Sequence, residues 1–114
     1  MRKRGEIWLA DLNPRRGTEP GKTRPVLLVQ AQALLDADHP STLVVPLTTQ
    51  LQTDAEPLRI RVSVGEKLPK DSELLIDQLR AIDNHRLVKG PLAKLSQAQL
   101  YQVDQALAEV LDLF

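Results

Sequence analysis

Residues 4–30, RGEIWLADLNPRRGTEPGKTRPVLLVQ, place two apolar runs on either side of a Gly- and Pro-rich loop. Ile7, Trp8 and Leu9 begin the first run, and residues 26–29 form the second. Apolar runs that flank turn formers are typical of paired strands, so we expect both ends of the loop to be anchored in a core. The intervening residues 14–24 supply cations, hydroxyls, backbone N–H groups and a single carboxylate, a mixture that suits contact with phosphodiesters.

Short strand-like runs continue over most of the chain. Residues 58–64 alternate between apolar and more polar side chains, which is the period of a half-buried strand. Further strands are predicted at residues 6–11, 24–30, 42–47, 73–76 and 86–91. Glycine and proline residues separate these runs and favour chain reversals, which indicates a small barrel and not a parallel sheet.

The period changes near the end of the chain. Ser96 can cap a helix, with Gln99 three residues later as its capping-box partner. Apolar side chains then recur at helical spacing, at Leu100, Val103, Leu107, Val110 and Leu111. Residues 33–38 could add a short helical turn. The predicted fold class is therefore α+β, a small SH3-like antiparallel β-barrel with a C-terminal helix.

The composition restricts the class of protein. A chain of 114 residues is expected to form one domain, residues 1–114. It contains no cysteine, so neither disulfides nor a thiolate metal site are available. No apolar run approaches the ~18 residues of a membrane span, and the first residues do not resemble a signal peptide. We therefore expect a cytoplasmic protein without a membrane partner.

Charge is balanced in total but not in distribution. Lys and Arg number 15, as do Asp and Glu, which argues against a protein that coats nucleic acid non-specifically. Cations outnumber carboxylates in the first 24 residues, whereas Asp104, Glu109 and Asp112 have no basic neighbours after Lys94. The basic part could attract a phosphate backbone or an acidic protein. Terminal cations at residues 2–4 could equally be solvated side chains.

The sequence contains no recognisable motif for a catalytic metal site or for a nucleophilic side chain. His39 and His85 lie in predicted turns, and no HxxxH, CxxC or clustered carboxylate spacing accompanies them. A structural or solvated role is expected for both histidines, and neither a metal nor another cofactor is predicted. The nucleophile motifs and phosphate loops of hydrolases are also missing. Chemistry would then depend on positioning and charge.

Three blocks of sequence carry a family resemblance: the loop and strand at residues 14–29, VPLTTQ at residues 45–50, and LLIDQLRAID at residues 74–83. In this order they resemble the MazF/PemK family of toxin endoribonucleases, and the similarity spans nearly the whole chain. The resemblance implies metal-independent, sequence-specific cleavage of single-stranded RNA that leaves 2′,3′-cyclic phosphate and 5′-hydroxyl ends. It also implies a homodimer and a cognate antitoxin whose disordered acidic tail folds onto the toxin.

The resemblance also selects catalytic residues. Arg24 matches the catalytic arginine of the family, and a guanidinium can hold two phosphate oxygens at once. Thr48 matches a threonine that stabilises the phosphate, although from the sequence alone Thr48 and Thr49 are β-favouring residues whose role could be packing. Glu19 is a possible base for the 2′-hydroxyl if no ion pair holds it, and it ranks below the other two because only some family members use the matching glutamate in this way.

RNA contacts are expected from the same loop and from the other two blocks. Thr18, Gly21 and Lys22 would contact phosphates, with Thr49 and Gln50 beside the catalytic threonine. Gln78 could read a base edge or simply fill a sheet edge. Two other functions remain open: a toxin of the same fold that inhibits DNA gyrase by protein binding, and an RNA-binding module that does not cleave.

Overall fold

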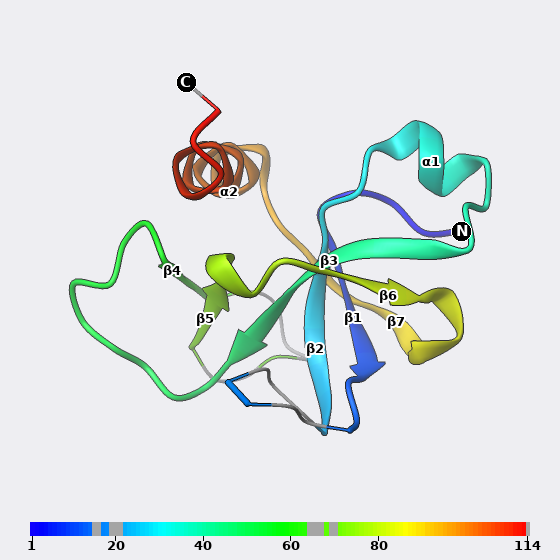
Figure 1. The fold of residues 1–114 in the computed structure, drawn as a ribbon, viewed down its shortest axis with the longest axis horizontal. Coiled ribbons are helices and arrows are strands. Elements are labelled where there is room, and N and C mark those ends of the chain that lie inside the picture. The colour runs from blue at the N-terminus through cyan, green and yellow to red at the C-terminus, as the bar shows by residue number, and fades with distance from the viewer. Residues whose placement is uncertain (15–16, 19–21, 64–67, 69–70, 114) are drawn as a thin grey trace.

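The computed structural model describes residues 1–14, 17–18, 22–63, 68 and 71–113 (Figure 1). Strands dominate the described chain, and one long helix follows them. The elements in chain order are β1 (Glu6–Asp11), β2 (Thr23–Leu28), α1 (Gln32–Asp36), β3 (Ser41–Thr48), β4 (Arg59–Val62), β5 (Ser72–Leu75), η1 (Ile76–Gln78), β6 (Arg80–Asp83), η2 (Asn84–Arg86), β7 (Leu87–Lys94) and α2 (Gln97–Val110).

All strand pairs are antiparallel, in the order β4-β5-β3-β2-β1-β7, and β6 pairs with β3 beside this path. The long strand β3 changes partner along its length, because Ser41 to Val44 pair with β6 whereas Leu47 and Thr48 pair with β5. Such a change of partner bends the sheet into an open barrel, and no pairing among the described residues joins β4 to β7. The predicted α+β class and barrel-like sheet with a C-terminal helix are confirmed.

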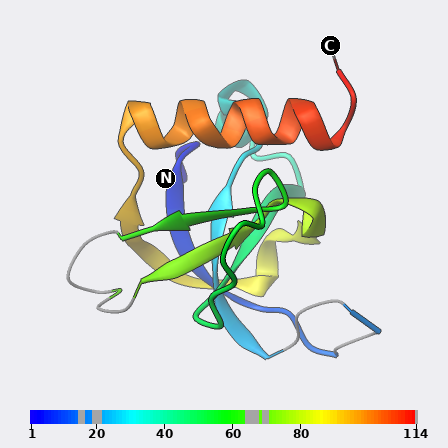
Figure 2. The same ribbon diagram turned by 90° about the vertical axis from the view of Figure 1, so that its left-hand side faces the viewer.

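The core fills both faces of this bent sheet. Successive residues of a strand point to opposite faces, so Leu27 and Val45 enter one apolar cluster while Val26 and Val44 enter another. Helix α2 covers the first cluster with its Val103 face, and Figure 2 shows it lying along one side of the sheet. The middle strands are thereby buried on both faces, which leaves the strand ends and their loops to carry polar groups.

Helix α2 begins as the sequence predicts. The Ser96 side chain accepts a hydrogen bond from the Gln99 amide, and the Gln99 side chain accepts one from the Ser96 amide. Arg4 then ties the helix to the sheet, because Nη2 lies 2.7 Å from Asp104 Oδ1 and Nε donates to the Val29 carbonyl. Arg4 is therefore a structural cation and not part of a free basic surface.

Two local features differ from the sequence prediction. Strand β6 was not expected, because its short sequence RAID presents only one large apolar side chain, the buried Ile82. Trp8, part of the apolar run that was expected to anchor the loop in the core, is only half-buried and packs against the second apolar cluster. Its indole lies against the backbone of Gly90 on β7, where a Cβ would be only 2.3 Å from Trp8 Cδ2. That close approach explains why β7 carries a glycine.

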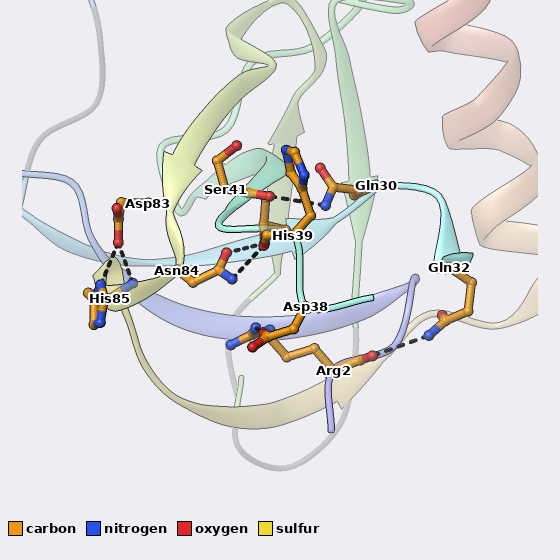
Figure 3. Close-up of polar contacts among 10 residues, drawn as sticks. Arg2, Gln30, Gln32, Asp38, His39, Ser41, Asp83, Asn84 and His85 are labelled. Atoms are coloured by element: carbon orange, nitrogen blue, oxygen red, sulfur yellow. Dashed lines mark hydrogen bonds and ion pairs between the residues drawn. The ribbon is translucent and has the colours of Figure 1, made fainter. Parts of the chain in front are cut away.

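A polar network holds the α1 side of the molecule, as Figure 3 shows. Gln30 Nε2 donates to the Ser41 carbonyl, and Asn84 Nδ2 donates to the His39 carbonyl at 2.7 Å. His85 is exposed and its backbone amide and ring bond to Asp83, which lowers the pKa of that carboxyl. His85 thus lies in the short helix η2, and His39 lies in the loop before β3, where its carbonyl accepts the bond from Asn84.

Candidate active site at the ends of β2 and β3

Strands β2 and β3 are neighbours in the sheet, and the start of β2 and the end of β3 both lie in the lower half of the view in Figure 1. The β2–β3 pairing reaches Val26 and Pro46, two residues from Arg24 on one strand and from Thr48 on the other. A cavity of about 300 Å³ opens at this point. Its lining residues are Thr23, Arg24, Pro25, Leu47, Thr48, Thr49, Leu68 and Ser72. The sheet therefore unites the two residues predicted to be the main catalytic groups.

Thr48 presents its hydroxyl from a well-packed position. Its residue surface is 8% exposed, and its neighbour Leu47 is buried in the core. Thr48 Oγ1 accepts a hydrogen bond of 3.2 Å from the Gln50 amide, so the hydroxyl hydrogen remains for donation to another acceptor. Leu47 and Thr48 are adjacent and therefore face opposite sides of the strand. Leu47 packs in the core, and Thr48 presents its hydroxyl to the cavity.

Arg24 is half-buried, and strand pairing fixes its backbone. Arg24 lies opposite Ala10 of the neighbouring strand β1, and the next residue, Pro25, lies opposite Leu9 of β1. A cation whose main chain is held on a paired strand loses less freedom when its side chain binds an anion than a cation on a loose loop would. The geometry therefore suits a preorganised anion contact beside the Thr48 hydroxyl.

The base of the β1–β2 loop is closed by hydrogen bonds. The Lys22 amide donates to Asn13 Oδ1 at 2.8 Å, and the Leu12 amide donates to the Lys22 carbonyl at 2.9 Å. Arg86, from the turn before β7, donates to the carbonyls of Asp11 and Asn13. Lys22 is exposed, as its predicted contact with a phosphate requires.

The other predicted binding residues have different surroundings. Thr18, Thr49 and Gln50 are exposed, and Gln50 is bonded to Thr48. Gln78 is half-buried in η1, which packs along β3, and it does not line the cavity. Glu19 and Gly21, predicted as a base and as a phosphate contact, lie outside the described residues.

A second cavity, of about 600 Å³, adjoins Thr48 through its cross-strand partner Glu73. Its lining residues are Gln52, Thr53, Asp54, Ala55, Glu56, Arg59, Arg61 and Glu73. Sequence reasoning missed this cavity. The signal was present in the strand SELL, residues 72–75, where a carboxylate occurs within a fully buried run, but its partners come from distant segments.

Hydrogen bonds and two cations offset the unfavourable burial of the Glu73 carboxylate. Burial raises its pKa, but hydrogen bonds from the Gln52 amide, Arg59 and Arg61 together outweigh burial and keep the pKa below the ordinary value of 4.5.

Within the part of the chain that the structure describes, no three His, Cys, Asp or Glu side chains gather into a possible metal site. No helix there is long and apolar enough to cross a membrane.

Comparison with known proteins identifies the family. Residues 3–111 match the family model of the PemK-like, MazF-like toxins of type II toxin–antitoxin systems. The chain belongs to this toxin family. A curated relative, the endoribonuclease MazF of Staphylococcus epidermidis, is 35% identical over 108 residues, which are 94% of this chain and 88% of that protein.

Solved structures agree with the PemK/MazF-like fold. A mycobacterial endoribonuclease in complex with its cognate antitoxin superposes with a TM-score of 0.78 at 21% identity, over 100% of this chain and 98% of that one. MazF from Deinococcus radiodurans also gives a TM-score of 0.78 at 21% identity, over 97% of this chain and 96% of that one. The barrel that brings Arg24 to Thr48 is thus the fold of other toxins of this type.

Proposed function

We propose that this toxin is an endoribonuclease that cleaves single-stranded RNA at a short sequence. The observation that carries the proposal is the cavity lined by both Arg24 and Thr48, where an arginine on a paired strand shares a site with a hydroxyl that can donate. Family membership and the name of the 35% identical relative support the same activity. RNA suits such a site, because its own 2′-hydroxyl is the nucleophile and the protein need only align and stabilise the reacting groups.

In the proposed reaction the 2′-oxygen attacks the adjacent phosphorus and the bond to the 5′-oxygen of the next nucleotide breaks. The products are a 2′,3′-cyclic phosphate and a 5′-hydroxyl. Arg24 would stabilise the charge that develops on the phosphate oxygens, and the Thr48 hydroxyl would donate to one of them. Glu19 would accept the 2′-proton, and the departing 5′-oxygen takes a proton from solvent or a neighbouring acid.

The same proposal assigns binding roles. The exposed Thr18 and Lys22, with Gly21, would hold phosphates next to the scissile one. Thr49 and Gln50 continue directly from Thr48 along the chain and would contact the adjacent nucleotide. Gln78, on the other edge of β3, would reach a base only if the RNA crosses that strand.

Cleavage should not need a metal ion, because the protein's own cation and hydroxyl perform the charge stabilisation. The test is incubation of the pure protein with a defined single-stranded RNA in EDTA, followed by mapping of both end groups. We expect cleavage to persist with cyclic phosphate ends. Activity that disappears with chelator and returns with Mg²⁺ would overturn the mechanism, and a protein that never cuts would favour a non-cleaving or gyrase-directed toxin.

Arg24→Ala is the sharpest variant for this function. Removal of a preorganised charge-stabilising group typically lowers kcat about 10²–10³-fold. Lys89→Ala, which removes an exposed cation from β7, is the matched control for a simple loss of positive charge. Equal turnover of the two folded variants would remove Arg24 from the site.

Two protein partners belong to the proposal. An acidic antitoxin tail would compete with RNA for the cations near the cavity, and several solved structures of the same fold are toxin–antitoxin complexes. A second copy of the chain would cover apolar side chains left exposed after α2, where Leu111 is 51% and Leu113 is 66% exposed. Sedimentation at micromolar concentration tests the homodimer, and a monomer that still cleaves RNA would refute it.

A further inference from the structure

The buried carboxylate of Glu73 connects the candidate active site to the segment that follows it. Glu73 lies on β5 directly opposite Thr48, and its side chain is only 4% exposed. An ionised carboxylate at such a position is unfavourable unless hydrogen bonds and cations compensate it. The identity of its partners therefore shows which parts of the chain depend on it.

Both oxygens of Glu73 are occupied. Oε1 accepts from the Gln52 amide at 2.8 Å and from Arg59 Nη1 at 3.1 Å, while Oε2 accepts from Arg61 Nη2 at 3.1 Å. Arg59 Nη1 also donates to the Gln50 carbonyl at 2.8 Å. The carboxylate thus holds the main chain directly at Gln52 and, through Arg59, at Gln50.

These bonds matter because residues 50–52 have little other support. They belong to no helix or strand, and all three residues are exposed. The remaining bond between this segment and the rest of the described chain is the one from the Gln50 amide to Thr48 Oγ1. Gln52 also forms part of the wall of the 600 Å³ cavity beside Thr48.

We propose that Glu73 is a positioning residue that fixes residues 50–52 beside the catalytic Thr48, so that this segment meets the RNA in one conformation. The inference rests on the proposed ribonuclease function and deepens it. Glu73 itself contacts no RNA, because its oxygens are turned to Gln52 and the two arginines. Its effect should appear in substrate binding and in the choice of cleavage sequence more than in the chemical step.

The two arginines provide a matched pair of variants. Both form an ion pair with Glu73, but only Arg59 also reaches the main chain of the segment, at Gln50. Arg59→Gln should therefore raise KM roughly tenfold, the scale of one lost hydrogen bond to a charged group, with kcat nearly unchanged and the cleavage sequence relaxed. Arg61→Gln should leave both KM and the cleavage sequence close to those of the wild type.

Glu73→Gln is the direct test and should reproduce the Arg59→Gln pattern in a stronger form. The measurements are kcat and KM on an RNA with one cleavage site, a map of cuts in mixed-sequence RNA, and exchange rates of the Gln50 and Gln52 amides. If Glu73→Gln fails to fold, Arg59→Gln against Arg61→Gln still decides the question.

Equal effects of the two arginine variants, or a loss of kcat with unchanged KM and unchanged cleavage sequence, would overturn the positioning role. A wild-type protein that cuts no RNA would refute the ribonuclease proposal, and the positioning role in RNA binding with it. Wild-type cleavage with unaltered sequence choice in Arg59→Gln and Glu73→Gln would sink only the positioning role.

Discussion

The Thr48→Val variant distinguishes a catalytic role of the Thr48 hydroxyl from a role of Thr48 in packing. Valine keeps the β-branched shape and deletes the oxygen that accepts a hydrogen bond from the Gln50 amide. Gln50 is exposed, so its amide can turn to water, and the loss of stability should stay near the lower end of the range for a hydrogen bond, about 0.5–1 kcal/mol. If the same hydroxyl donates to the phosphate, kcat should fall about 10²–10³-fold, equivalent to roughly 3–4 kcal/mol of barrier.

Thr42→Val is the matched control for this change. Thr42 is on the same strand, is 1% exposed, and donates through its hydroxyl to Asn84 Oδ1 at 2.7 Å. Removal of that donor leaves Asn84 Oδ1 without this partner, although Asn84 Nδ2 still donates to the His39 carbonyl, and the loss of such a bond typically costs about 1–3 kcal/mol of stability. Thr42 is remote in register from the cavity residues, so its substitution should lower the melting temperature without lowering kcat.

The assay pairs thermal unfolding with single-turnover cleavage of a defined RNA. The two variants should show opposite patterns: a rate defect for Thr48→Val and a stability defect for Thr42→Val. If Thr48→Val melts far below the wild type while it cleaves at the wild-type rate, Thr48 is a packing residue and the catalytic assignment is wrong.

Three further predictions concern stability. Gly90→Ala places a methyl group 2.3 Å from Trp8 Cδ2, so overpacking should destabilise the protein by about 1–3 kcal/mol, and an unchanged melting temperature would contradict the close approach. Arg4→Met removes the contacts that tie Asp104 of α2 to the sheet and should cost about 1–2 kcal/mol in chemical denaturation, with less effect if α2 docks without them. Because the folded-state pKa of Glu73 lies below 4.5, its ionisation stabilises the fold above that pH, and this contribution is lost as the pH falls through the lowered pKa. Urea titrations of Glu73→Gln and the wild type should therefore show a shallower acid dependence for the variant below pH 4.5, and parallel curves would exclude the ionised carboxylate.

Elements with a strong local pattern were predictable from the sequence. The capping box at Ser96 and the helical repeat that follows predict α2, because both signals lie within one element. Period-two alternation likewise predicts β4, although the strand ends at Val62. Strand β6 escaped prediction since a four-residue strand with a single buried side chain, Ile82, carries too little pattern.

The candidate site was predictable only where the family resemblance supplied it. Arg24 and Thr48 are distant in sequence, and they line one cavity because β2 and β3 are antiparallel neighbours in the sheet, which no local pattern encodes. Glu73 is harder still, because its partners at Gln52 and Arg59 belong to two other segments of the chain. A buried ion pair becomes visible only when all the segments are assembled.

The ion pairs of the structure bear on how a chain with zero formal net charge could bind RNA. Arg2, Arg4, Arg59 and Arg61 each form an ion pair with a carboxylate, so these cations contribute to folding and not to a general phosphate-binding surface. A protein with zero formal net charge gains little non-specific affinity for nucleic acid, since that affinity comes from counterion release at many phosphate contacts. Under the proposed function, recognition would then depend on a few fixed groups near the reacting phosphate. The packed strand ends and the Glu73-anchored segment would provide such fixed groups, which is the arrangement that the proposed cleavage at a short sequence needs.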